Sequence, residues 1–219
     1  MNDIGIAPSI LAADFGYLMR DIKAVEGHAD YLHIDVMDGH YVNNISFGIP
    51  VIQSIRKYTD MKFYTHLMIT DPEKYIKAFA DCGSDNITFH IECTDDPDAL
   101  IASIRDLGVS VGISVHPDTP IEKVFPYIDK VDLILIMTVY PGFGGQGYLP
   151  SSNERIMKLR KEIDSRGSNT IISVDGGVGM NNIKEIYEAG ARLFVAGSSV
   201  FGAEDPSKAV EDLKIKALT

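Results

Sequence analysis

Hydrophobic and polar positions along the chain follow one alternation that repeats eight times. A short apolar run, typical of a buried strand, is followed by an amphipathic stretch whose apolar residues recur with a helical period. The strands predicted in this way are residues 4–9, 31–36, 62–68, 86–91, 110–115, 131–137, 170–174 and 193–196. Helices are predicted at residues 14–26, 48–58, 72–81, 97–107, 120–126, 152–166, 181–189 and 205–217.

Strands that alternate with helices predict a parallel sheet with right-handed crossovers. Eight such units can close into a (β/α)8 barrel of the TIM type, and 219 residues would make a compact one. The alternative is an open doubly wound sheet, which usually carries a glycine-rich dinucleotide loop after its first strand. That position reads "PSILAADFG" here, without G-x-G-x-x-G. We therefore predict a single (β/α)8 barrel domain over residues 1–219.

Polar residues gather where the predicted strands end, which is where such a barrel carries its chemistry. They are Ser9, His33, Asp35, His66, His90, Thr138, the segment from Asp175 to Gly177 and the segment from Gly197 to Ser199.

The run "YLHIDVMDGH" places His33 and Asp35 two positions apart, so both side chains project to the same side of a strand. With His66 and Asp175 from other strand ends, they can present two imidazoles and two carboxylates to one divalent cation. This ligand set suits zinc, iron, manganese or cobalt, and ligand type alone does not rank them. We expect one such ion per subunit, with zinc a marginal first choice.

The other histidines are less informative. His90 in "NITFHIE" is interpreted as a hydrogen-bonded core residue rather than a ligand, since a single histidine on an apolar strand is usually that. His28, His40 and His116 fall in predicted helix ends or loops, where we expect surface or pocket-rim positions.

Glycine-rich turns follow the last three predicted strands: "PGFGGQ", "DGGVG" and "AGSSVFG". Each turn taken alone is consistent with a simple tight turn. Glycine also lets backbone amides approach an anion, and a phosphate site after strands 7 and 8 recurs in this architecture. Gly176, Gly177, Gly197 and Ser198 are therefore candidate phosphate-binding residues.

Three methionines at strand ends, Met37, Met68 and Met137, would form an apolar wall near the proposed metal. Methionine is usually core filling, but beside a metal it can exclude water from an unstable intermediate.

Composition limits the partners and the setting. The formal net charge of −11 argues against a nucleic-acid or anionic-membrane surface. Cys82 and Cys93 show neither a zinc spacing nor a disulfide framework, and "MNDIGIAPSI" lacks the features of a signal peptide. No apolar stretch approaches the roughly 20 residues that span a bilayer. We expect a soluble, cytoplasmic protein.

Six segments carry a resemblance that extends over almost the whole chain: "IAPSILAADF", "HIDVMDGHYV", "HLMITDPEKYI", "MTVYPGFGGQ", "VDGGV" and "FVAGSSVFG". In this order they resemble the ribulose-phosphate 3-epimerase family, metal-dependent barrel enzymes that interconvert D-ribulose 5-phosphate and D-xylulose 5-phosphate in the pentose phosphate pathway.

The resemblance implies roles for individual residues. His33, Asp35, His66 and Asp175 would be the metal ligands, and Asp35 and Asp175 also the acid/base pair. The substrate-contacting residues implied, together with the wall proposed above, are Ser9, Met37, His66, Met68, Met137, Gly142, Phe143, Gly144, Gly145, Gly176, Gly177, Gly197 and Ser198. Homo-oligomers are expected, as in relatives.

Departures from the family pattern leave the substrate open. Asn43, His116, Tyr140 and Ser173 stand where the family usually has other residues, and Tyr140 or His116 would be able to adjust the pocket. The same epimerisation of another ketose phosphate, such as D-allulose 6-phosphate, is one alternative. A metal-free phosphate-binding barrel, either a lyase or synthase or a non-catalytic binder, is the alternative from a different class.

Overall fold

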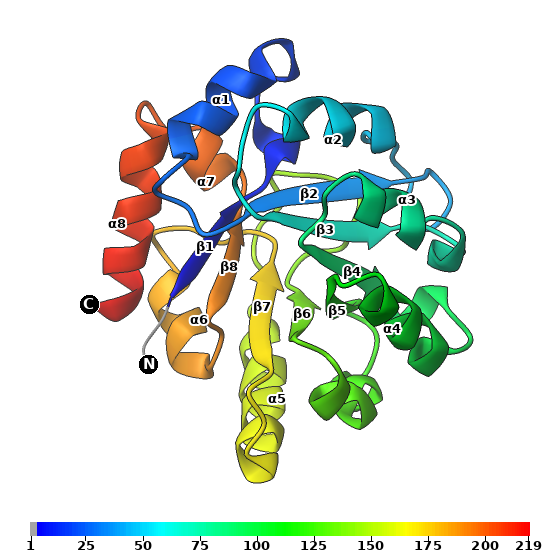
Figure 1. Ribbon diagram of the computed structural model, residues 1–219. Coiled ribbons are helices and arrows are strands. Elements are labelled where there is room, and N and C mark those ends of the chain that lie inside the picture. The colour runs from blue at the N-terminus through cyan, green and yellow to red at the C-terminus, as the bar shows by residue number, and fades with distance from the viewer. Residues whose placement is uncertain (1–3) are drawn as a thin grey trace.

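The computed structural model describes residues 4–219, in which eight parallel strands form a nearly closed barrel with helices around it (Figure 1). The strands are β1 (Gly5–Pro8), β2 (Leu32–Met37), β3 (Phe63–Met68), β4 (Asn86–His90), β5 (Ser110–Val115), β6 (Leu133–Met137), β7 (Ile171–Asp175) and β8 (Leu193–Ala196). Their order is β1-β8-β7-β6-β5-β4-β3-β2, and a single parallel bridge between Ser9 and His33 joins the two ends. The predicted (β/α)8 barrel is confirmed.

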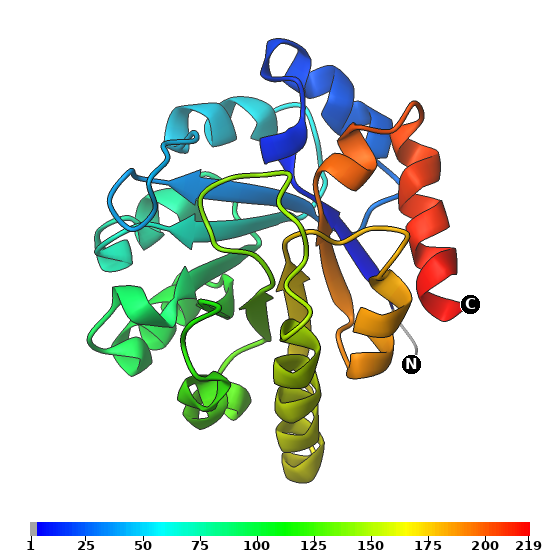
Figure 2. The ribbon, with the colours of Figure 1, turned by 180° about the vertical axis from the view of Figure 1, so that it is seen from behind.

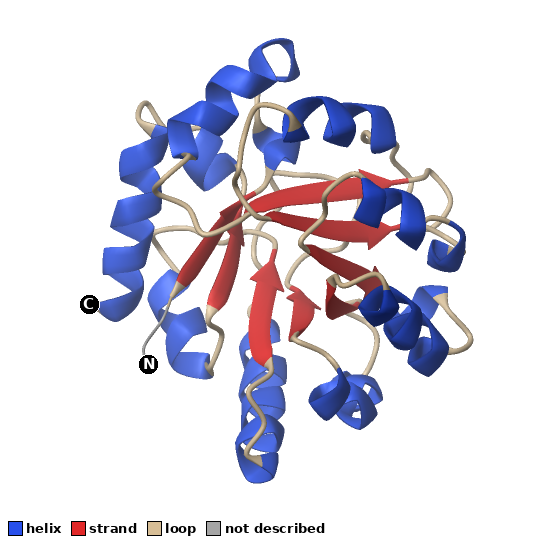
Figure 3. Cartoon of the chain, viewed as in Figure 1, coloured by secondary structure: helices blue, strands red, loops and turns tan. Residues whose placement is uncertain are grey.

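Helices cover the outside of the barrel, as Figure 3 shows in blue around the red strands. The α-helices are α1 (Leu18–Val25), α2 (Ile49–Arg56), α3 (Ile76–Asp81), α4 (Pro97–Asp106), α5 (Ser152–Arg166), α6 (Ile183–Ala189), α7 (Ser198–Phe201) and α8 (Pro206–Leu218). The 3₁₀ helices are η1 (Ile10–Ala12), η2 (Phe15–Tyr17), η3 (Pro72–Lys74), η4 (Ile91–Cys93) and η5 (Ile121–Lys130).

The longest helix shows how the sequence sets these elements. In α5, Ile156, Leu159 and Ile163 lie on one stripe and are fully buried, so the helix packs that stripe against the barrel. It ends at Gly167, which adopts a left-handed φ of 64° that glycine tolerates.

Four expectations about the helices need correction. The predicted helix at residues 120–126 is the longer 3₁₀ helix η5; Pro126 lies inside it and has no N–H to donate to an α-helical ladder. The predicted helix at residues 14–26 is divided between η2 and α1, and the one at residues 72–81 between η3 and α3. The short helix α7, which follows β8, was expected only as a glycine-rich turn.

Side chains on the strands alternate between two environments. Those that point outward, such as Ile34 and Val36, join the large apolar core beneath the helices. A smaller apolar cluster contains Tyr64, Leu135 and Val195 from the alternate strand positions, which face the barrel interior. Buried polar residues also occur along these strands, and Asn86, the first residue of β4, bonds to Thr88 and Ser110.

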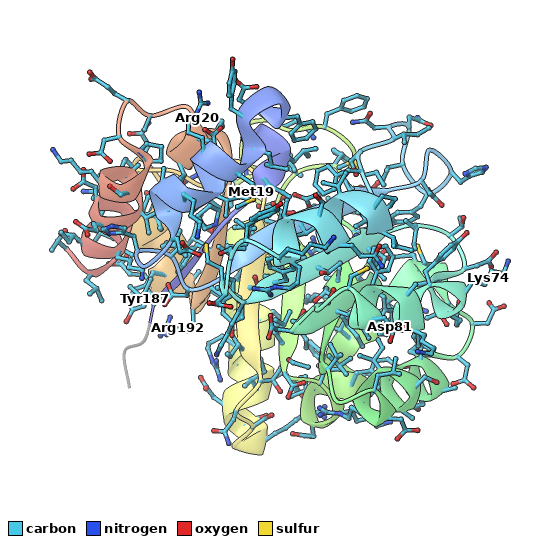
Figure 4. The ribbon with its side chains drawn as sticks, turned by 45° about the horizontal axis from the view of Figure 1, so that its top comes forward. Met19, Arg20, Lys74, Asp81, Tyr187 and Arg192 are labelled. Carbon is cyan, nitrogen blue, oxygen red and sulfur yellow. The ribbon has the colours of Figure 1, made fainter. Side chains whose placement is uncertain are left out.

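Charged side chains occupy the periphery. Lys74 projects at the right-hand edge of the molecule in Figure 4, and Asp81 is exposed at the end of α3. Tyr187 and Arg192 lie beside each other at the opposite end from the strand carboxyl termini, with the Arg192 guanidinium 4.2 Å from the Tyr187 ring centroid.

Candidate active site

Four polar side chains converge inside the barrel at the carboxyl ends of three strands. His33 and Asp35 come from β2, His66 from β3 and Asp175 from the last residue of β7. His33 Nε2 lies 3.1 Å and His66 Nδ1 3.2 Å from Asp35 Oδ1, and Asp175 Oδ2 lies 3.7 Å and 3.6 Å from the same two nitrogens. One donor atom from each residue lies within 4.8 Å of all the others. The structure thus brings together all four residues predicted to hold a metal.

Strand register explains this convergence. Asp35 on β2 is paired with His66 on β3, so their side chains point inward from adjacent positions. On the other side, Met137 is paired with Asp175, and the Thr138 hydroxyl donates to the Asp175 carbonyl oxygen over 2.8 Å. The backbone that carries each donor is therefore fixed by the sheet.

The pKa values of His33, Asp35 and Asp175 are set by attraction between the carboxylates and the imidazole rings, in competition with burial. Burial alone would lower the pKa of His33, but the carboxylates of Asp35 and Asp175 outweigh it and raise that pKa to about 9. The pKa of Asp35 is lowered, because His33 and His66 overcome the cost of burying the carboxylate. The pKa of Asp175 is also lowered by the two imidazoles, against burial and the charge of Asp35.

The donor set fits a divalent cation. Four donors about 2.1 Å from a tetrahedral ion would be about 3.4 Å apart, and the four nitrogen–oxygen distances here are between 3.1 and 3.7 Å. The two ionised carboxylates also place negative charge at one point, and a bound cation, rather than a proton, would neutralise it.

A cavity of about 220 Å³ opens above this cluster. Asp35 and Asp175 line it, whereas His33 and His66 are completely buried and do not. Its walls also include Ser9, Met37, Met68, Met137, Gly142, Phe143, Gly144, Gly145, Gly176, Gly177, Gly197 and Ser198. Every residue expected at the substrate, apart from the buried His66, therefore lies on the cavity wall.

Ser9 connects the first strand to this cluster. Its hydroxyl donates to Asp35 Oδ2 over 2.5 Å and accepts from the backbone N–H of Leu11, which caps η1. Asp35 thus has one oxygen turned toward the imidazoles and the other held by Ser9. This leaves the Asp35 carboxylate with a single orientation.

The loop after β7 depends on glycine. Gly176 and Gly177 have φ angles of 121° and 66°. A Cβ on Gly177 would lie 2.8 Å from Tyr148 Cα and 3.0 Å from Gln146 O, and closer still to Tyr148 N. The loop after β7 therefore packs directly against the backbone of the loop after β6. The loop after β8 is tied in as well, because the Ser199 hydroxyl donates to Val178 O.

The loop between β6 and α5 arcs across the front of the barrel in Figure 2. The Gln146 amide donates to the carbonyl oxygens of Tyr140 and Phe143, and Asn44 donates to Gly142 O over 2.7 Å. Asn44 belongs to the segment after β2, so this bond ties that segment to the loop after β6. Sequence reasoning missed Asn44, and no local pattern marks it.

His90 is fully buried and hydrogen-bonded, as expected of a core histidine. Its neighbours, however, are polar: His66, Tyr41 and Glu92. Burial lowers the pKa of His90 to about 4 despite the nearby Glu92. Sequence reasoning missed Tyr41 and Glu92. The only available signal was that Glu92 lies two positions after His90.

The remaining histidines lie outside this cluster, with His28 and His40 exposed and His116 half-buried at the end of β5. His116 packs edge-on against Tyr140, whose hydroxyl donates to Asp118. Neither His116 nor Tyr140 is among the residues that line the cavity, so their effect on it is indirect.

Two other family departures and the cysteines are also placed by the structure. Asn43 is exposed, and Ser173 is buried below the site, where it accepts a hydrogen bond from Tyr64. Cys82 and Cys93 are free thiols, in line with the absence of a disulfide framework. Within residues 4–219, no helix has both the length and the apolar character needed to traverse a bilayer.

Comparison with solved structures confirms the fold. The chain superposes on KGPDC from Streptococcus mutans with a TM-score of 0.72 and 16% identity, covering 98% of this chain and 97% of that one. It is similar in the same way to an orotidine 5'-phosphate decarboxylase from Pyrococcus horikoshii, with a TM-score of 0.71, 13% identity and coverage of 98% and 99%.

Sequence comparison is more specific. The model of the ribulose-phosphate 3 epimerase family matches residues 5–201. Ribulose-phosphate 3-epimerase of Mycobacterium tuberculosis is 44% identical over 212 residues, which cover 97% of this chain and 92% of that protein. The enzyme of the same name from Bacillus subtilis is 43% identical over 213 residues, with coverage of 96% and 98%. The chain therefore belongs to the ribulose-phosphate 3-epimerase family and is an enzyme of the isomerase class.

Proposed function

We propose that this enzyme inverts carbon 3 of a ketose phosphate, D-ribulose 5-phosphate to D-xylulose 5-phosphate, with the aid of one divalent metal ion. The observation that carries the proposal is the pair of ionised carboxylates, Asp35 and Asp175, that reach one cavity from strands on different sides of the barrel. Relatives over 40% identical carry the name of this reaction.

Inversion beside a carbonyl requires one group to remove a proton from one face and another to return a proton to the other face. Asp35 and Asp175 are assigned these two roles. Ser9 holds Asp35 in place, and the Thr138 hydroxyl holds the backbone of Asp175. Because the two carboxylates come from β2 and β7, a substrate carbon between them would have one acid on each face.

His33, Asp35, His66 and Asp175 would hold the metal ion. A bound divalent cation would polarise the substrate carbonyl and offset the negative charge that develops on oxygen when the proton leaves. Zinc, iron, manganese and cobalt suit the donor set, with zinc a marginal first choice. Met37, Met68 and Met137 line the same cavity and would keep water from the carbanionic intermediate.

The phosphate group of the substrate is assigned to the loops after β7 and β8. Gly177, Gly197 and Ser198 face the cavity, and Ser198 opens α7, so its N–H has no partner within the helix. Recognition by backbone amides would allow a protein of net charge −11 to bind a phosphorylated sugar without a basic patch.

The test is epimerisation in D2O together with metal analysis of the purified protein. The proposal expects about one divalent ion per chain, loss of activity with a chelator, and one deuterium at carbon 3 of the product. Product that retains the substrate hydrogen, or activity indifferent to metal removal, contradicts it.

Substrate choice is tested by parallel kinetics on ribulose 5-phosphate and allulose 6-phosphate. We expect kcat/KM for the pentulose to be higher by about a hundredfold, equivalent to about 2.8 kcal/mol in barrier. A preference for the hexulose overturns the pentulose assignment but leaves the epimerase chemistry standing.

Three wider expectations complete the proposal: residues 1–219 act as one catalytic domain, the enzyme is cytoplasmic, and it forms homo-oligomers. A rice relative that is 44% identical carries the name of a cytoplasmic isoform. Sedimentation that shows only monomer at high concentration would contradict the oligomer.

A further inference from the structure

A chain of hydrogen-bonded polar side chains extends from His66 away from the cavity, from the buried His90 to the partly exposed Tyr41 and Glu92. His66 Nε2 lies 2.9 Å from His90 Nε2. On its other side, His90 Nδ1 lies 2.8 Å from the Tyr41 hydroxyl and 3.2 Å from Glu92 Oε2. Both imidazoles are completely buried, so the hydrogen bond between them is shielded from water.

The geometry between His66 and His90 is that of a hydrogen bond rather than a face-to-face stack. The ring centroids lie 5.0 Å apart and the ring planes differ by 25°. With the nearest nitrogens 2.9 Å apart, the line joining those nitrogens must run close to both ring planes. One nitrogen therefore points its N–H at the lone pair of the other.

The surroundings determine which nitrogen carries the proton. His66 Nδ1 faces Asp35 Oδ1 and Asp175 Oδ2, where a metal ligand must offer a lone pair. The proton of neutral His66 is then on Nε2, and His90 Nε2 accepts it. His90 in turn carries its own proton on Nδ1, which faces Tyr41 and the Glu92 carboxylate.

The end of this chain is fixed by the backbone. Glu92 Oε1 accepts the N–H of His116 over 3.0 Å, so the carboxylate spans from His90 to the end of β5. The His116 carbonyl oxygen accepts from Arg155 of α5 over 2.8 Å. Glu92 is therefore held in one position as the final acceptor.

His33 has no comparable support. Its Nδ1 is buried and has no hydrogen-bond partner among residues 4–219. Of the two imidazoles at the site, only His66 has its second nitrogen engaged by a side chain within the part of the chain that the structure describes.

We infer that His90, backed by Tyr41 and Glu92, is a positioning residue that fixes the Nε2–H tautomer and ring orientation of His66, and so presets its Nδ1 to bind the metal ion. Partners of this kind typically change metal affinity about 10- to 100-fold when removed. The inference rests on the proposed metal-dependent function and deepens it.

The tautomers are testable directly by NMR of zinc-loaded protein labelled with ¹⁵N-histidine. The inference expects a proton on Nε2 of His66 and on Nδ1 of His90. A His66 ring protonated on Nδ1 overturns it. This measurement uses the unaltered protein, so it does not depend on how any variant folds.

Variants test the energetic role through affinity for Co²⁺, followed by its visible absorption in competition with a chelator. His90→Phe keeps a planar ring but offers no acceptor and should weaken binding about 10- to 100-fold. In His90→Gln the amide oxygen can accept from His66 and the amide group can donate to Glu92, so most of the affinity should return. Ser114→Ala is the matched control: Ser114 pairs with His90 across β4 and β5, and its buried hydroxyl lacks a partner among residues 4–219.

The outcomes distinguish failure of the metal site from failure of the positioning role of His90. Wild-type protein that binds no Co²⁺ overturns the metal site and this inference with it. If the wild type binds Co²⁺ and a folded His90→Phe variant binds it with an affinity within about threefold of the wild type, the positioning role alone is overturned. Equal weakening of Co²⁺ binding in His90→Phe and His90→Gln also overturns it. A loss in His90→Phe that His90→Gln restores, with Ser114→Ala unchanged, supports it.

Discussion

The contact between the loops after β6 and β7 can be tested by adding one methyl group at Gly177. This residue has a φ of 66°, and a Cβ would approach backbone atoms of Tyr148 and Gln146 at 3.0 Å or less. The left-handed backbone alone should cost Gly177→Ala about 1–2 kcal/mol. Overpacking against backbone that cannot rotate away should add about 1–3 kcal/mol.

Gly167 provides the matched control because its φ is 64° and a Cβ there would meet nothing within 4 Å. It ends α5, at the far end of the barrel from the cavity. Gly167→Ala should therefore show only the backbone cost, about 1–2 kcal/mol, with unchanged kinetics. The difference between the two variants isolates the contact between the loops.

The assay combines denaturant unfolding with steady-state kinetics on ribulose 5-phosphate. Gly177→Ala should be less stable than Gly167→Ala by about 1–3 kcal/mol, and the melting temperature should fall by about 2–4 °C for each kcal/mol. KM should rise by about tenfold or more, because both loops that line the cavity must move. Equal stability and equal KM in the two variants would refute the packing of these loops described above.

Three further predictions test the site. Asp35→Asn and Asp175→Asn should each lower kcat by orders of magnitude, because each would remove a proposed base and a proposed metal ligand; near wild-type turnover in either would refute the two-base assignment. Ser9→Ala removes a hydrogen bond to a carboxylate worth about 1.5–3 kcal/mol and should lower kcat/KM about tenfold or more, with an unchanged value speaking against its role in holding Asp35. In metal-free protein the pKa of His33 is raised from 6.5 to about 9, so its stabilising charge is fully present below pH 6.5 and is lost as pH rises toward 9; melts that show no such decline would contradict this pairing.

Much of the fold was predictable because each strand is a short buried run and each crossover has its own apolar stripe. The eight strands lie within about two residues of their expected bounds, since burial makes most positions of each run apolar. The error at η5 arose from backbone chemistry: Pro126 disfavours an α-helix that the apolar period alone would suggest.

The convergence of His33, Asp35, His66 and Asp175 was predictable because parallel strands deliver their carboxyl ends to one place. The connections around them were not. Asn44, in the segment after β2, donates to Gly142 in the loop after β6, and nothing near either residue in the sequence reveals this pairing. Tyr140 was expected to be able to adjust the pocket, but its side chain turns to Asp118. Loop conformation decides these contacts, and local pattern does not encode it.

The most direct test of the central claim is an anomalous-scattering map, recorded at the metal absorption edge, from crystals of the zinc-loaded enzyme. The account predicts one peak per chain, about 2.0–2.2 Å from His33 Nε2, Asp35, His66 Nδ1 and Asp175. A map with no peak among these four residues, or with the ion bound elsewhere, would contradict it.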